Sequence, residues 1–185
     1  MKLGSAIAGA VILIVIVVVV AIVVSVLGIY DVSADRPHGP IGRVIAYVRE
    51  RSIDVRAEGI TVPPLGKPDM IADGAGHYDA MCTGCHLAPG MRDNELRPGM
   101  NPRPPKLAAF GPGDPKEQFW IVKHGIRMTG MPAWGVTHSD VDIWNIVAFL
   151  QKLPKLSPEQ YRALVKQGGE HEHGASEHGG MPMPH

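Results

Sequence analysis

The chain has 185 residues, with 18 basic and 18 acidic side chains and no net charge. Nucleic acid is excluded as a partner, because binding it requires a basic surface. Aromatic residues make up only 5%, and 22 glycines and 17 prolines interrupt the rest. Such a chain suits a small domain built around something other than protein. The only two cysteines stand three residues apart, too close for a disulfide between them to add much stability.

The first apolar segment, residues 6–29, contains no charged side chain. As a helix it would reach about 36 Å, enough to cross a hydrocarbon core of about 30 Å. The alternative is a cleaved signal peptide, with Val32-Ser33-Ala34 as the cleavage site. The apolar region of a signal peptide spans only about 7–15 residues, which is shorter than residues 6–29 of this chain. We therefore expect residues 1–30 to remain as a transmembrane anchor in the lipid bilayer. Lys2 favours a cytoplasmic N-terminus, which would place the rest on the periplasmic side of a bacterial inner membrane.

The next segment, residues 31–68, is predicted to be a periplasmic linker that contains one amphipathic helix. Pro40 can open this helix and Gly59 can end it. One stripe at helical spacing is largely apolar, and charged residues lie opposite it. The helix either packs on the following domain or lies on the membrane surface, and we favour packing. The stripe consists of Ile41, Val44, Ile45, Val48, Ser52 and Val55, and the charged residues are Arg43, Glu50 and Asp54.

The sequence Cys82-Thr83-Gly84-Cys85-His86 has the C-x-x-C-H spacing of a haem attachment site. Two thiols three residues apart can form thioethers with the two vinyl groups of one haem, and the next residue, His86, then faces the iron. A redox dithiol is less favoured because no strand pattern precedes Cys82. Half a zinc site is less favoured because no partner pair of ligands follows. We predict one covalently bound haem c.

The surrounding residues resemble the class I cytochromes c. Upstream stands Gly74-x-x-x-Tyr78-x-x-x-Cys82, similar to the first helix of that family, in which the glycine lets the C-terminal helix cross closely. Downstream, Thr129-Gly130-Met131-Pro132 resembles the loop that carries the sixth iron ligand. The resemblance thus implies His86 as the proximal ligand and Met131 as the distal ligand. Met128 is the nearest rival, followed by Met91 and Met100.

The resemblance also implies a proline-bearing loop whose backbone carbonyl orients the proximal imidazole. Several prolines compete for this role, and Pro98 has a plausible spacing without being decisive. The competing residues are Pro89, Pro98, Pro102, Pro104 and Pro105.

Two further helices are predicted in the haem domain, which we place at residues 69–156. Asp114-Pro115-Lys116-Glu117 opens a helix that ends at Gly125, and Ser139-Asp140-Val141-Asp142 opens a second, followed by Pro154. The second resembles the C-terminal helix of the class I cytochromes. The fold expected is therefore all-α: a small helical domain around one haem, after an N-terminal transmembrane helix.

The last segment, residues 157–185, is predicted to be a short helix over 158–166 and a disordered tail from Gly168. The tail is rich in histidine, glutamate and methionine, so a divalent metal is a possible ligand there. Its histidines are His171, His173, His178 and His185.

Electron transfer is the favoured function, with membrane-bound or periplasmic redox proteins as donor and acceptor. A haem with both axial positions filled has no open site for a substrate, so the chain is expected to be an electron carrier, or the cytochrome subunit of an oxidoreductase complex, rather than an enzyme by itself. Two alternatives stay open: a copper- or nickel-handling protein that uses the tail, and a haem sensor that releases Met131 to bind a gas or a substrate.

Overall fold

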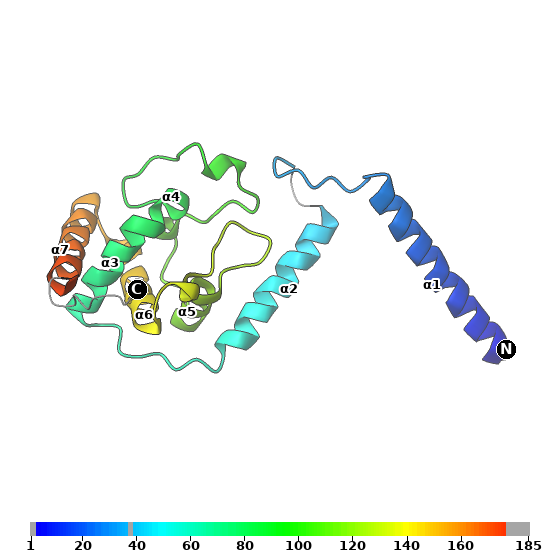
Figure 1. Cartoon of the computed structure of the whole chain (residues 1–185), viewed down its shortest axis with the longest axis horizontal. Helices are drawn as coiled ribbons and strands as arrows, with labels where there is room; N and C mark the ends of the chain where they lie inside the picture. Colours follow the sequence, from blue (N-terminus) through cyan, green and yellow to red (C-terminus); the bar gives the residue numbers. More distant parts are fainter. Residues whose placement is uncertain (1–2, 37–38, 177–185) are drawn as a thin grey trace, which may run out of the picture. The chain divides into compact units, whose positions relative to one another are not determined.

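The structure, a computed structural model, describes residues 3–36 and 39–176, and every regular element in these ranges is helical (Figure 1). The α-helices are α1 (Leu3–Val26), α2 (Pro40–Ala57), α3 (Pro68–Met81), α4 (Thr83–His86), α5 (Pro115–His124), α6 (Asp140–Leu150) and α7 (Pro158–Ser176). Four short 3-10 helices join them: η1 (Arg97–Gly99), η2 (Leu107–Ala109), η3 (Trp134–Val136) and η4 (Leu153–Lys155). The all-α prediction is confirmed. The chain divides into two units, Met1–Pro37 and His38–His185.

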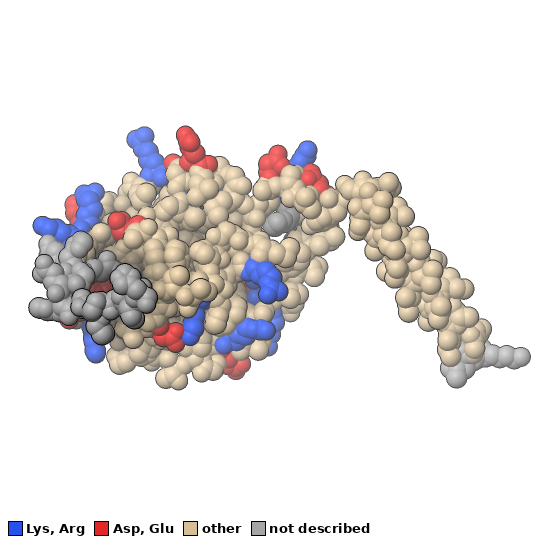
Figure 2. Space-filling model, viewed as in Figure 1, with Lys and Arg blue, Asp and Glu red and all other residues tan. Residues whose placement is uncertain are grey.

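The first unit contains α1, which is long and apolar enough to cross a membrane from Gly4 to Val26. None of this stretch is buried within the structure, and Figure 2 shows no charged side chain along the helix. A surface of exposed valine and isoleucine is unfavourable in water and favourable in lipid. The helix stops at Val26, three residues before the predicted end of the apolar segment, because Gly28 turns the backbone to a φ of 62°.

In the second unit, α3 and α6 cross with their backbones in contact. A methyl group at Gly74 of α3 would overlap the carbonyl oxygen of Asn145 in α6. Beside this contact, Tyr78 and Phe149 are fully buried, with ring centroids 5.2 Å apart. The close crossing at Gly74 that the resemblance implied is therefore present.

The predicted starts of α5 and α6 are also present. The Asp114 carboxylate accepts a hydrogen bond of 2.8 Å from the backbone N–H of Lys116, and Ser139 and Asp142 form a reciprocal capping box. These caps direct both helices into the core, where Phe119 of α5 stacks on Trp144 of α6 at 4.2 Å between centroids.

The last described helix, α7, is longer than the sequence indicated. It continues to Ser176, so the expected disorder from Gly168 is wrong for residues 168–176. The reason is a tertiary contact: a Cβ at Gly168 would overlap the Ala72 carbonyl oxygen of α3, so the absence of a side chain allows close packing. The Tyr161 hydroxyl adds a hydrogen bond of 2.6 Å to Asp79 of α3. Residues 177–185, with His178 and His185, lie outside the described residues.

Helix α2 packs against α5, within the same unit as the predicted haem domain, and lies on the other side of α3 and α6 from α7 (Figure 1). The face that it buries differs from the stripe identified in the sequence. Gly42, Ile53 and Ala57 are buried, whereas Ile41, Val44 and the other apolar residues of that stripe are exposed. The buried face thus combines two small residues with one isoleucine, so tertiary contacts rather than hydrophobicity alone select the buried residues.

The α3–α6 crossing generates a stability prediction. Gly74→Val should lower the free energy of unfolding by about 2 kcal/mol or more, because the added side chain must push a backbone carbonyl aside. Gly66→Ala is the matched control, since a Cβ there meets nothing within 4 Å. Thermal unfolding followed by far-ultraviolet circular dichroism measures both. Equal melting temperatures for the two variants would show that the crossing tolerates a side chain.

Candidate haem-binding site

The C-x-x-C-H segment begins where α3 ends. Cys82 is the C-terminal cap of α3 and the N-terminal cap of α4, and its N–H donates to the Tyr78 carbonyl. The single turn of α4 then carries Cys85 and His86. Both cysteines are free thiols, and burial raises the pKa of the Cys82 thiol to about 12. The two sulfurs and the imidazole thus reach the cavity from one short, fixed segment.

The backbone of Pro105 orients His86. The imidazole Nδ1–H donates to the Pro105 carbonyl oxygen at 2.9 Å, which leaves Nε2 as the free nitrogen for a metal. The sequence had offered Pro98 on spacing, but the structure places Pro105 in this role. Burial lowers the pKa of His86, and the nearby charge of Arg97 lowers it further against the opposing effect of the Pro105 bond. The neutral imidazole, which is the form that binds metals, is therefore favoured.

A buried arginine holds the loop that carries Pro105. The Arg97 side chain is 1% exposed, and its Nε donates to the Cys85 carbonyl at 2.7 Å while Nη2 donates to the Pro104 carbonyl at 2.6 Å. One guanidinium thereby joins the turn before His86 to the residue before Pro105. Arg97 was not identified from the sequence, because no pattern in the adjacent residues predicts that this arginine is buried.

Asp93 balances the charge of Arg97. Its carboxylate accepts a hydrogen bond of 2.5 Å from Arg97 Nη1 and pairs with Arg103 and, at 3.6 Å, with Lys106. Desolvation acts to raise the pKa of Asp93, but the Arg97 hydrogen bond and the three positive charges outweigh it and hold the pKa below its usual value. Asp93 therefore stays ionised at neutral pH and keeps the buried guanidinium paired.

The loop containing Met131 lies on the same cavity. It is closed by a hydrogen bond of 3.1 Å from the Ile126 N–H to the Met131 carbonyl, and the Met131 N–H donates to Thr129 Oγ1 at 3.1 Å. Gly125, with a φ of 64°, leaves room for the Met131 backbone to approach α5. Met131 lines the cavity, whereas the rival Met128 is 78% exposed.

Of the other methionine rivals, Met91 is exposed and Met100 lines the cavity. The end of the Met100 side chain packs against Gly130, directly beside the Met131 loop. The structure thus brings three methionines, Met81, Met100 and Met131, to the cavity that Cys82, Cys85 and His86 also line.

The cavity has a volume of about 500 Å³ and a largely apolar lining, as expected for an enclosed organic cofactor. Ile121, Val122 and Leu150 supply part of that lining. Two arginines, Arg49 of α2 and Arg103, also line it and suit the carboxylates of a haem. The residues present fit a haem in donor set, volume and polarity. Arg49 was missed in the sequence because only the fold brings α2 to the cavity.

Comparison with known proteins adds one result. Residues 69–150 match the family model of cytochrome C oxidase, cbb3-type, subunit III. They form a class I c-type cytochrome domain. Neither a curated protein nor a solved structure gives a significant match to the chain. Helix α2, which closes part of the cavity of this cytochrome domain, lies outside the matched residues.

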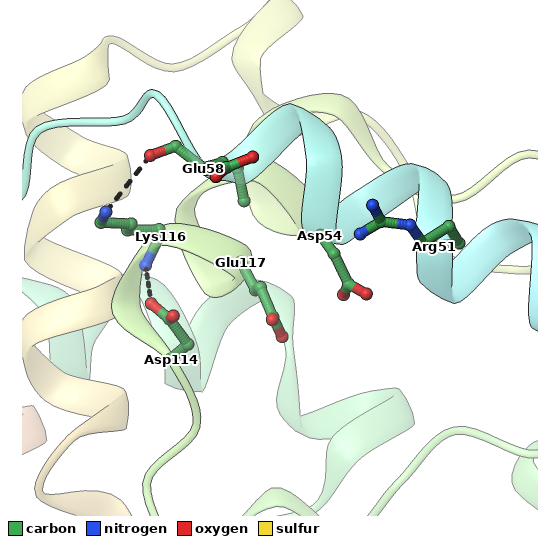
Figure 3. Close-up of a pocket in the computed structure, with 7 residues that line it drawn as sticks. Arg51, Asp54, Glu58, Asp114, Lys116 and Glu117 are labelled. Atoms are coloured by element: carbon green, nitrogen blue, oxygen red, sulfur yellow. Dashed lines mark hydrogen bonds between the residues drawn. The ribbon is translucent and has the colours of Figure 1, made fainter.

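A second, polar pocket lies between α2 and α5 of the cytochrome (Figure 3). Lys116 donates from Nζ to the Glu58 carbonyl at 3.3 Å and so joins the two helices. Burial raises the pKa of Glu117, with further contributions from the negative charges of Asp114 and Asp54. This pocket has the polar lining of a helix junction and none of the sulfur or imidazole donors of the haem cavity.

The predicted metal-binding tail adds no described metal site. Among the side chains that the structure describes, no group of three histidine, cysteine or acidic residues is placed to hold a metal ion. The side chains of His171 and His173 are outside the described set, as are His178 and His185.

The Arg97 contacts predict a large effect on stability. Arg97→Met should lower the free energy of unfolding of the haem domain by about 3 kcal/mol or more, because the Cys85 and Pro104 carbonyls lose their donor and Asp93 loses the buried one of its three cationic partners. Arg103→Gln also removes a pair with Asp93, but Arg103 is 52% exposed, so a loss below about 1 kcal/mol is expected. Urea unfolding of the two variants measures both. Comparable losses would show that the total charge around Asp93, rather than the buried guanidinium, stabilises this loop.

Proposed function

We propose that this chain carries single electrons on one covalently bound haem c, held at the periplasmic face of a bacterial inner membrane by α1. It would act as a shuttle between membrane-bound or periplasmic redox proteins, or as the cytochrome subunit of a respiratory complex. The observation that carries the proposal is the convergence of the C-x-x-C-H segment and the Met131 loop on one apolar cavity. The cytochrome domain match and the apolar helix support it independently.

Each cavity residue has a distinct role in this proposal. Cys82 and Cys85 form the thioethers, and His86 binds iron through Nε2 because Pro105 occupies Nδ1. Met131 supplies a neutral, soft sulfur as the sixth ligand, which favours the ferrous state and raises the reduction potential. The haem iron supplies the one-electron change between its ferrous and ferric states. The apolar walls would pack on the haem, and Arg49 and Arg103, which also pair with Glu50 and Asp93, would supply positive charge to its carboxylates.

A filled sixth position separates an electron carrier from a gas sensor. If Met131 stays bound to iron, no coordination site is open and the chain only accepts and releases electrons. The Met131 backbone is tied to both Ile126 and Thr129, which restrains the loop from opening. This restraint favours electron transfer over the sensor alternative.

The haem should resist extraction. Two thioethers would keep it on the chain after denaturation, so acid–acetone treatment should release none, and the intact mass should exceed that of the polypeptide by one haem. Cys82→Ala and Cys85→Ala should each weaken attachment, and the double variant should release all haem. Complete release from the unmodified chain, or a mass increase of two haems, would contradict the proposal.

Met131→Ala should abolish the weak near-infrared band that arises from sulfur-to-iron charge transfer in the oxidised protein. The same variant should bind carbon monoxide in the reduced state, because its sixth position is open, whereas the unmodified protein should not.

Met100→Ala and Met128→Ala serve as controls and should keep the band and exclude carbon monoxide. If Met100→Ala alone lost the band, Met100 would be the ligand. If the unmodified reduced protein bound carbon monoxide readily, the sensor alternative would replace electron transfer.

A further inference from the structure

Helix α2 presents three distinct faces. The first, which packs on the domain, consists of Gly42, Ala46, Arg49, Ile53 and Ala57, all buried or half-buried. The other two faces are exposed.

The second face is apolar and runs along one side of the helix. Its members recur at helical spacing, so they lie on a continuous stripe. We call it the α2 stripe: Ile41 (57% exposed), Val44 (62%), Ile45 (43%), Val48 (58%) and Val55 (49%).

The third face is polar and contains Arg43, Tyr47, Glu50 and Asp54. By helical spacing the acidic side chains lie away from the α2 stripe, whereas Arg51 and Arg56 flank it on its two sides. Arg51 also lines the polar pocket of Figure 3, beside Asp54 and Glu117. Arg56 donates at 3.0 Å to Ser52, a half-buried serine that lies between Val48 and Val55, which places its guanidinium along the edge of the stripe. An apolar stripe with arginines at its borders is the pattern of a helix that lies in the interface of a membrane.

If α1 spans the membrane, it keeps α2 close to the lipid surface. Only residues 27–39 separate the end of the candidate membrane span from the start of α2, and fully extended they reach at most about 45 Å. The helix is therefore held at high local concentration near the lipid surface. A second copy of the chain is a weaker candidate for covering the stripe, because stable interfaces use about 20–30 residues on each side and this stripe has five apolar residues.

We propose that the α2 stripe lies in the headgroup region of the membrane, with Arg56 directed to lipid phosphates. This inference rests on the proposal that α1 spans the membrane. Since Arg49 and Ile53 on the first face line the haem cavity, one helix would then contact both lipid and cofactor. The haem domain would be oriented on the membrane rather than held only by a flexible tether.

The test uses the full haem-loaded chain in vesicles of phosphatidylcholine and phosphatidylglycerol. Single cysteines replace Val48 on the stripe and Glu50 on the polar face. Both positions are exposed in the structure, so neither change should disturb folding, and an unchanged haem absorption spectrum checks this. Reaction with a water-soluble maleimide reports accessibility, normalised to the rate in urea. Both variants insert into the vesicles in the same mixture of orientations. The ratio of their maleimide reaction rates therefore does not depend on which way the protein faces.

At low protein density, we expect Val48→Cys to react at least about tenfold more slowly than Glu50→Cys, because lipid covers the stripe. Val44→Cys should behave like Val48→Cys. Equal rates in protein that floats with the vesicles would overturn the proposal. Protection that appears only at high protein density would also overturn it and assign the stripe to a second copy. Protein that fails to float would instead contradict the anchor.

Discussion

The contact between α3 and α6 at Gly74 determines where the haem site lies. Helix α3 runs directly into the Cys82–His86 segment, so the position of α3 sets the position of both thiols and the imidazole. Helix α6 brings Leu150 to the cavity and Trp144 to the α5 interface. A side chain at Gly74 would separate the two backbones and displace the segment from the cavity. The glycine is therefore a constraint on the cofactor site as well as on packing.

The sequence was sufficient to predict those features that interactions between neighbouring residues determine. The caps at Asp114 and Ser139 and the stop at Gly125 follow from short patterns, the crossing at Gly74 follows from the family resemblance, and the structure contains each of them. It was insufficient where contacts between distant segments decide. Pro105 receives the His86 hydrogen bond although Pro98 had the more plausible spacing, because Arg97 and Asp93 shape the intervening loop.

The same distinction explains α2 and α7. In α2, hydrophobicity identified a stripe but the fold buried Gly42, Ile53 and Ala57 beside it, since close helix packing depends on shape as well as on apolarity. In α7, glycines that weaken an isolated helix allow it to approach α3, so residues that predicted disorder instead favour docking. A single sequence does not reveal which neighbour a helix will meet.

The helices that pack on α3 lie far downstream in the sequence. This separation affects the order in which the contacts form during folding. Its Asp79 bonds to Tyr161, 82 residues further on, and α6 also follows long after it. Contacts between residues so far apart form slowly, because a long loop must close first. If the chain is exported as we propose, the Cys82–His86 segment would emerge before α6 and α7, which pack on α3. If haem is attached as we propose, the thiols would be reachable in the nascent chain before α6 brings Leu150 to the cavity, so attachment would precede the final fold.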